Sequence, residues 1–174
     1  DVSWVGLTGS AAYNNGVYTV AGSGWDIWSN SDAFNFASSS MSGNGTITAR
    51  VTSQSNTNDW AKAGVMMRST LDGNAPHVMV VVTPSNGVQM AYRTSAGDIT
   101  NFAGSVSGIT APYWVRLTRA GSTFTGFVSA DGVNWTQVGS IGFDMPSTLL
   151  TGLAVTAHDN QLLNVATFDN VTLS

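Results

Sequence analysis

The sequence predicts an all-β protein, built as a two-sheet antiparallel jelly-roll sandwich in which one sheet is concave. The first observation is that turn-forming pairs of Gly, Asn and Asp recur at short intervals between apolar runs of strand length. The second is that no window of helical length keeps its apolar residues at the 3.6-residue period of a helix. The third is that lysine occurs once and glutamate never, so two good helix formers are almost absent.

Strands are expected between these turns. Each intervening run has the length of a strand, and its residues either alternate between apolar and polar or are apolar throughout. In 152–158, for example, Leu153, Val155 and Ala157 share one side. The expected strands, in chain order, are 16–21, 32–38, 45–53, 61–69, 77–83, 87–94, 113–120, 123–129, 135–140, 149–158 and 164–173.

One group of these strands carries two different faces. In 61–69 and 77–83 the apolar side is expected to face the core; it consists of Ala61, Ala63, Val65, Met67, Val78, Val80 and Val82. The opposite side combines small residues with basic and polar ones, and it continues in 87–94 and 152–158. The expected register pairs Arg68 with His77, Met66 with Met79, Gly64 with Val81, then Ala91 with Val81 and Arg93 with Met79. The small-and-basic face therefore predicts a groove across the sheet.

Composition narrows the functional classes. The net charge of −4 argues against a nucleic-acid-binding protein, and no stretch is apolar enough to span a membrane. The chain lacks cysteine, which leaves the compartment open, and its charged fraction is only 9%. We expect residues 1–174 to form one β-rich, secreted domain, as a module of a larger extracellular protein.

Several segments together resemble bacterial concanavalin A-like, laminin-G-like jelly-roll modules that are appended to polysaccharide-acting enzymes. The segments are Tyr18–Gly24, Asp26–Trp28, Trp60–Arg68, Tyr113–Leu117, Ser129–Gly132 with Trp135, and Phe168–Val171. The resemblance covers nearly the whole chain, and Trp60–Arg68 is its most specific part. It implies a two-sheet fold, a carbohydrate-binding or adhesive role, and a catalytic domain in the same parent chain as a partner.

The polar face of the predicted groove supplies the first candidate site. Its ligand-binding residues are Lys62, Arg68, His77, Gln89, Arg93 and His158. These side chains bind hydroxyls, and the arginine fork also suits acidic sugars, so a neutral or acidic polysaccharide or oligosaccharide is expected. The alternative is a solvated outer face with scattered charges.

Aromatic residues near strand ends supply the second candidate. Trp25, Trp28 and Trp60 could stack on the C–H faces of sugars, or could pack within loops. Asp26 and Asp32 flank Trp28 and could accept sugar hydroxyls, although an Asx-turn role is open for both.

A structural calcium ion is the expected cofactor, because comparable jelly-roll modules often bind one where the terminal strands meet. Asp169, together with Asp1 or a nearby carbonyl, would supply the oxygen ligands. The alternative for Asp169 is an exposed edge-strand aspartate.

The sequence favours binding over catalysis. Hydrolases on this fold carry closely spaced Glu-Asp-Glu acids on one strand, which a chain without glutamate cannot provide. A polysaccharide lyase acting on uronate-containing glycan is the enzymatic alternative, with Arg68, Arg93, His77 and His158 as its candidate groups. A structural or adhesin domain without a sugar site is the third hypothesis.

Overall fold

The computed structural model describes residues 1–174 as an all-β chain without helices. The antiparallel strands form a jelly-roll sandwich, as the sequence predicts. They are β1 (Ser10–Asn14), β2 (Val17–Gly24), β3 (Asp26–Trp28), β4 (Ser31–Ala33), β5 (Asn35–Ser42), β6 (Gly45–Ser53), β7 (Lys62–Arg68), β8 (His77–Val82), β9 (Val88–Arg93), β10 (Asn101–Val106), β11 (Tyr113–Ala120), β12 (Thr123–Ser129), β13 (Thr136–Gly142), β14 (Thr148–Thr156) and β15 (Asp159–Leu173).

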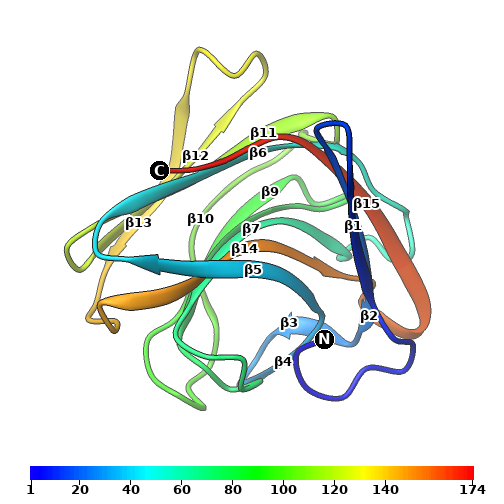
Figure 1. The fold of residues 1–174 in the computed structure, drawn as a ribbon, viewed down its shortest axis with the longest axis horizontal. Coiled ribbons are helices and arrows are strands. Elements are labelled where there is room, and N and C mark those ends of the chain that lie inside the picture. The colour runs from blue at the N-terminus through cyan, green and yellow to red at the C-terminus, as the bar shows by residue number, and fades with distance from the viewer.

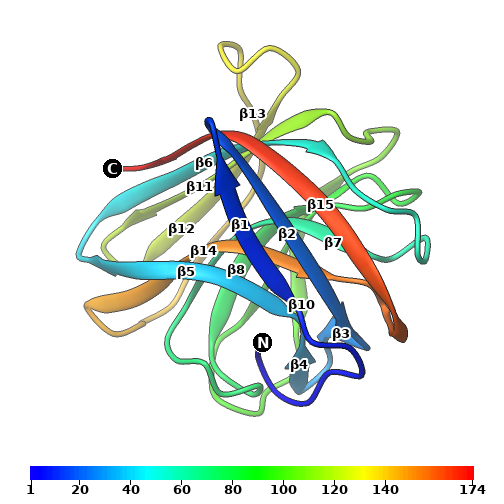
Figure 2. The same cartoon turned by 45° about the vertical axis from the view of Figure 1, so that its right-hand side comes forward.

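Two large sheets stack on each other (Figure 1). One has seven strands in the order β1-β2-β15-β6-β11-β12-β13, and the other has six in the order β10-β9-β8-β7-β14-β5. The small β3–β4 hairpin lies on the far side of the six-stranded sheet, close to the N-terminus (Figures 1 and 2). The sandwich therefore has a third, partial layer at one end.

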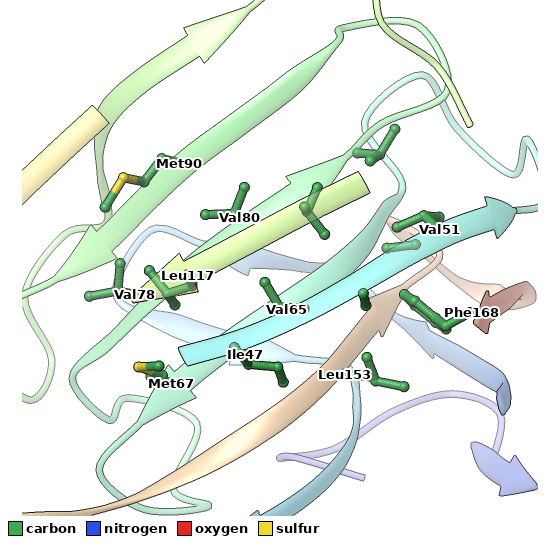
Figure 3. Packing of buried hydrophobic residues seen from close by; sticks show 14 of the residues in the cluster. Ile47, Val51, Val65, Met67, Val78, Val80, Met90, Leu117, Leu153 and Phe168 are labelled. Carbon is green, nitrogen blue, oxygen red and sulfur yellow. The ribbon is translucent and has the colours of Figure 1, made fainter. Parts of the chain in front are cut away.

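The main core lies between the two sheets (Figure 3). Val65, Met67 and Val80 of the six-stranded sheet face Ile47 and Leu117 of the other sheet, and all are buried. The apolar side expected for β7 and β8 is thus confirmed as the core side. Burial of such side chains removes apolar area from water, which is the principal stabilising term of a sandwich.

The sequence gives weak signals for three strands that the structure contains: β1, β3 and β10. β3 has only three residues, and β10 has a bulge between Phe102 and Gly104 that breaks regular alternation. The expected strand 32–38 is divided between β4 and β5, which belong to different sheets. Short or bulged strands lack the period that a sequence pattern needs.

The predicted register is correct for one hairpin and wrong for the next. β7 and β8 pair Arg68 with His77 and Met66 with Met79, as expected. β8 and β9, however, pair Met79 with Ala91, two residues away from the expected Arg93. The turn is tighter than predicted because the Thr83 hydroxyl donates to the Gly87 carbonyl, and Gly87 adopts a positive φ of 70°. A two-residue shift keeps every side chain on its predicted face.

The structure contains no helix long and apolar enough to cross a membrane.

Candidate functional site

The small-and-basic face exists, but half of it is buried under a second core. The β3–β4 hairpin and the N-terminal segment cover it, and Val2 pairs with Phe34 through a backbone hydrogen bond of 2.8 Å. The buried apolar residues of this second core are Val2, Ile27, Phe34, Met66, Met79, Val81, Ala91 and Ala154. The groove that the sequence predicts across the whole sheet is therefore wrong in extent.

Four of the predicted ligand-binding residues form a buried ionic cluster in this covered half. Asp32 accepts from Arg93 through both carboxylate oxygens, at 2.7 and 2.8 Å, and from Arg68 at 3.1 Å. His77 places Nδ1 3.5 Å from the same carboxylate. The side chains of all four residues are inaccessible to solvent, so the prediction that Arg68, His77, Arg93 and Asp32 contact a ligand is wrong.

The two arginines of the cluster hold loops against the sheet. Arg93 donates to the carbonyls of Ser29, Gly73 and Asp98 at 2.9 to 3.2 Å. Arg68 donates to the carbonyls of Thr70 and Asp72 at 2.7 and 2.6 Å. A guanidinium has five donors, and here they bond to loop carbonyls, including those of Thr70 and Asp98. Arg93 thus holds the β3–β4 turn at Ser29, whereas Arg68 holds the loop between β7 and β8.

The cluster also sets the protonation of its histidine. Burial lowers the pKa of His77 to about 4, an effect that the neighbouring Arg68 and Arg93 reinforce and Asp32 opposes. His77 is therefore neutral near pH 7, and its Nε2 atom has no hydrogen-bond partner within the protein. A neutral, enclosed imidazole does not provide a sugar contact or a catalytic acid.

The open half of the face contains a pocket of about 420 Å³. It collects side chains from the β3–β4 hairpin, β7, β9, β10 and the end of β14. The lining residues are Asp26, Trp28, Trp60, Lys62, Gln89, Phe102 and His158. Six of these seven belong to the predicted site, so the structure brings together the members that the ionic cluster does not use.

Lys62, Asp26 and His158 together form one wall of this pocket. The Lys62 ammonium pairs with Asp26 Oδ1 and donates to the Trp60 carbonyl at 3.0 Å. His158 Nδ1 lies 3.1 Å from Asp26 Oδ2 without forming a hydrogen bond. Asp26 is therefore held between a cation and an imidazole and keeps one-fifth of its side chain exposed.

The backbone at His158 is unusual. Its φ is +53°, in the left-handed region that residues other than glycine rarely adopt. Such conformations concentrate at functional sites, where the surrounding structure maintains them. The His158 amide is fixed by the Thr156 hydroxyl at 3.4 Å, and that hydroxyl also donates to the Gly24 carbonyl. The turn directs the imidazole toward the pocket that it lines.

Aromatic rings and a free amide complete the pocket. The rings of Trp28 and Phe102 are 4.7 Å apart and tilted by 38°. Trp60 and Phe102 are 39% and 48% exposed. Gln89 is buried to 4% exposure, yet no hydrogen bond within the protein engages its side-chain amide. Phe102 is the lining residue that the sequence analysis missed, because β10 was not expected.

The residues proposed for calcium lie in separate surroundings. Asp169 forms a two-pronged ion pair with Arg50, whose hydrogen bond lowers the pKa of that carboxyl. The Asp1 carboxylate accepts from the Gly9 amide at 3.1 Å. The structure does not bring the two together, and no group of three His, Cys, Asp or Glu side chains is arranged for a metal. The Asp1–Asp169 pairing is wrong, and calcium binding itself stays a prediction.

Comparisons with known proteins establish the fold. No family model and no curated protein sequence matches the chain. A protein of unknown function from Saccharomyces cerevisiae has a TM-score of 0.74 and 19% identity, over 95% of this chain and 91% of that one. The carbohydrate-binding module CBM66 from Bacillus subtilis has a TM-score of 0.64 and 18% identity, over 96% and 92%.

A GH43 protein from Bacillus licheniformis, BlXynB, has a TM-score of 0.69 at 12% identity. The likeness covers 92% of this chain but only 33% of that protein. At identities this low, the structural similarity establishes the jelly-roll fold alone, because proteins with this fold have many different functions.

Proposed function

We propose that the chain is a non-catalytic carbohydrate-binding module that holds a polysaccharide or oligosaccharide in the pocket beside the β3–β4 hairpin. The observation that carries the proposal is the combination of exposed aromatic rings with the unengaged amide of Gln89 in one hollow. Trp28, Trp60 and Phe102 provide apolar ring faces, while Gln89 and Asp26 provide donors and acceptors. Sugars present apolar C–H faces and hydroxyl edges, so both halves of this lining have a counterpart in the ligand.

The pocket suits neutral sugars better than acidic ones. Its one permanent cation, Lys62, is already paired with Asp26, and Arg68 and Arg93 are paired with Asp32 behind the second core. An anionic sugar would have to compete with Asp26 for the ammonium group. We therefore infer a neutral glycan as the preferred ligand, which narrows the expectation from the sequence.

Binding without cleavage is supported by the acids that the pocket offers. Glycoside hydrolysis usually needs two carboxyl groups on either side of the bond. Asp26 is the one carboxylate lining this pocket, and the nearby Asp32 is enclosed by two arginines. The arginines that a uronate lyase would use are buried as well.

Affinity electrophoresis tests the proposal. The native protein is run through gels containing xylan, β-glucan, levan, pectin or alginate, together with the variants Trp60→Ala, Phe102→Ala and Tyr13→Ala. We expect retardation by at least one neutral polymer, weakened about tenfold by each pocket substitution, roughly the loss of one aromatic contact. Tyr13 is 63% exposed and lines no pocket, so its variant is a matched control.

Two outcomes would contradict the proposal. If the native protein migrated freely in every gel, carbohydrate binding would be rejected in favour of a structural or adhesin domain without a sugar site. A rise in ultraviolet absorbance when the protein is added to alginate or pectin would demonstrate lyase activity. Circular dichroism spectra of the variants verify that lost retardation is not lost folding.

A further inference from the structure

The two most exposed tryptophans of the molecule lie outside this pocket. Trp4 is 72% exposed and Trp25 is 65% exposed. Neither ring stacks on another aromatic ring of the protein, and neither indole N–H is used in an internal hydrogen bond. Two neighbouring indoles left in water are an unusual surface for a soluble domain, and such surfaces mark binding sites.

These tryptophans line two further hollows that continue from the first. A hollow of about 430 Å³ contains Trp4 and Trp25, and it shares Asp26 and Trp28 with the first pocket. A second, of about 620 Å³, contains the same two tryptophans together with Asn160 at the start of β15. Neighbouring hollows thus share lining residues, and together they extend around the β3–β4 end of the sandwich.

The far end of this series of hollows has a polar group without a partner. Asn160 is only 7% exposed, and its Oδ1 accepts from the Gly6 amide at 3.3 Å. Its Nδ2 donates to no group of the protein. An unused buried donor is unfavourable unless another molecule accepts from it. Asn160 borders the larger of the two hollows, beside Trp4 and Trp25.

The segment that carries Trp4 is held in place. The Ser23 hydroxyl donates to the Leu7 carbonyl at 2.7 Å and accepts from the Leu7 amide at 3.0 Å. A Cβ at Gly6 would lie 2.0 Å from the Asn160 carbonyl oxygen, so the chain passes there in contact with β15. Trp25 follows Gly24, whose φ of +111° sets the turn out of β2. Both rings are therefore presented by anchored backbone.

We propose that Trp4, Trp25 and Asn160 form a second sugar-binding subsite, which takes a further stretch of the same glycan chain that occupies the first pocket. This inference rests on the proposed function, because the series of hollows begins at that pocket. It specifies the ligand as an extended polysaccharide chain. The continuity of the hollows favours this occupant, since one linear polymer can lie across aromatic faces and amide groups in succession.

Nuclear magnetic resonance with oligosaccharides of increasing length tests this inference. Oligosaccharides of two to eight units are cut from the polymer that retards the native protein in the gel assay. The indole N–H signals of Trp4, Trp25 and Trp60 are assigned with the variants Trp4→Phe, Trp25→Phe and Trp60→Phe. Of these three signals, we expect the shortest oligosaccharides to shift only that of Trp60, and longer ones to shift those of Trp4 and Trp25 as well.

Affinity follows the same length dependence. Trp4→Ala and Trp25→Ala should each weaken binding of the longest oligosaccharide by about two- to tenfold, while the shortest binds as before. Tyr13→Ala should leave both affinities unchanged. Shifts confined to Trp60 at saturation, with affinity independent of length, would overturn the second subsite alone. No shift at any tryptophan, or no polymer that retards the protein, would overturn the proposed function together with it.

Discussion

Replacing Asp32 by asparagine should destabilise the protein severely, although the change removes only one charge. The Asp32 carboxylate is 1% exposed and balances two guanidinium groups that are both fully buried. In Asp32→Asn, Arg68 and Arg93 would remain enclosed with no counter-ion. Removing one partner of a buried ion pair costs about 3–5 kcal/mol, because the remaining charge is left uncompensated. The melting temperature should fall by about 6–20 °C for a domain of this size.

Urea unfolding, followed by tryptophan fluorescence, measures this loss. The matched control is Asp169→Asn, which breaks the ion pair with Arg50 at the surface, where the side chains are 21% and 40% exposed. Such exposed pairs contribute about 0–1 kcal/mol. If Asp32→Asn lost no more stability than the control, the cluster would not hold the β3–β4 hairpin, and the reassignment of these arginines from ligand contacts to scaffold would fail.

Three further predictions concern pH, the pocket amide and calcium. His77 has a folded-state pKa of about 4, below its ordinary 6.5, so the unfolded chain binds more protons between these values and stability falls by up to about 3 kcal/mol as the pH drops from 6.5 to 4. Urea titrations at several pH values should detect that slope, and His77→Gln should flatten it. Gln89→Leu should weaken polysaccharide retardation about tenfold while unfolding shifts by less than about 0.5 kcal/mol, because no internal hydrogen bond is lost. If a structural calcium ion is bound near Asp169, a chelator should lower the melting temperature, and an unchanged melting curve would remove calcium from the account.

The alternation of β7 and β8 was enough to predict the core face. Val65, Met67 and Val80 lie where the period of two places them, because one sheet face must be buried whatever covers the other. The pairing of Arg68 with His77 was predicted as well, from the short loop 70–76 that joins the two strands. These features depend on neighbours within the strands, which a sequence displays directly.

The cover over the other face could not be predicted in the same way. It depends on a hairpin of two three-residue strands, which is too short to leave a periodic pattern. Met66 and Met79 gave the one available signal, since two large apolar residues among basic ones indicate a buried surface. Their burial in the second core explains why two large apolar residues lie on this face. The same cover explains why Arg68 and Arg93 are unavailable to a ligand.

The predicted site was therefore divided by tertiary structure. Residues beside the hairpin, such as Lys62 and His158, line the pocket, whereas those beneath it join the Asp32 cluster. Phe102 and Trp4 were missed for different reasons. Phe102 lies on a bulged strand, and Trp4 becomes part of a surface only because its segment is anchored on β2 and β15.

A crystal structure of the protein with an oligosaccharide of the retarding polymer tests the central claim most directly. The account predicts a sugar ring in the pocket lined by Trp28, Trp60 and Phe102, with a hydroxyl bonded to the Gln89 amide. Sugar density on the outer face of the seven-stranded sheet, with this pocket left without sugar, would contradict it.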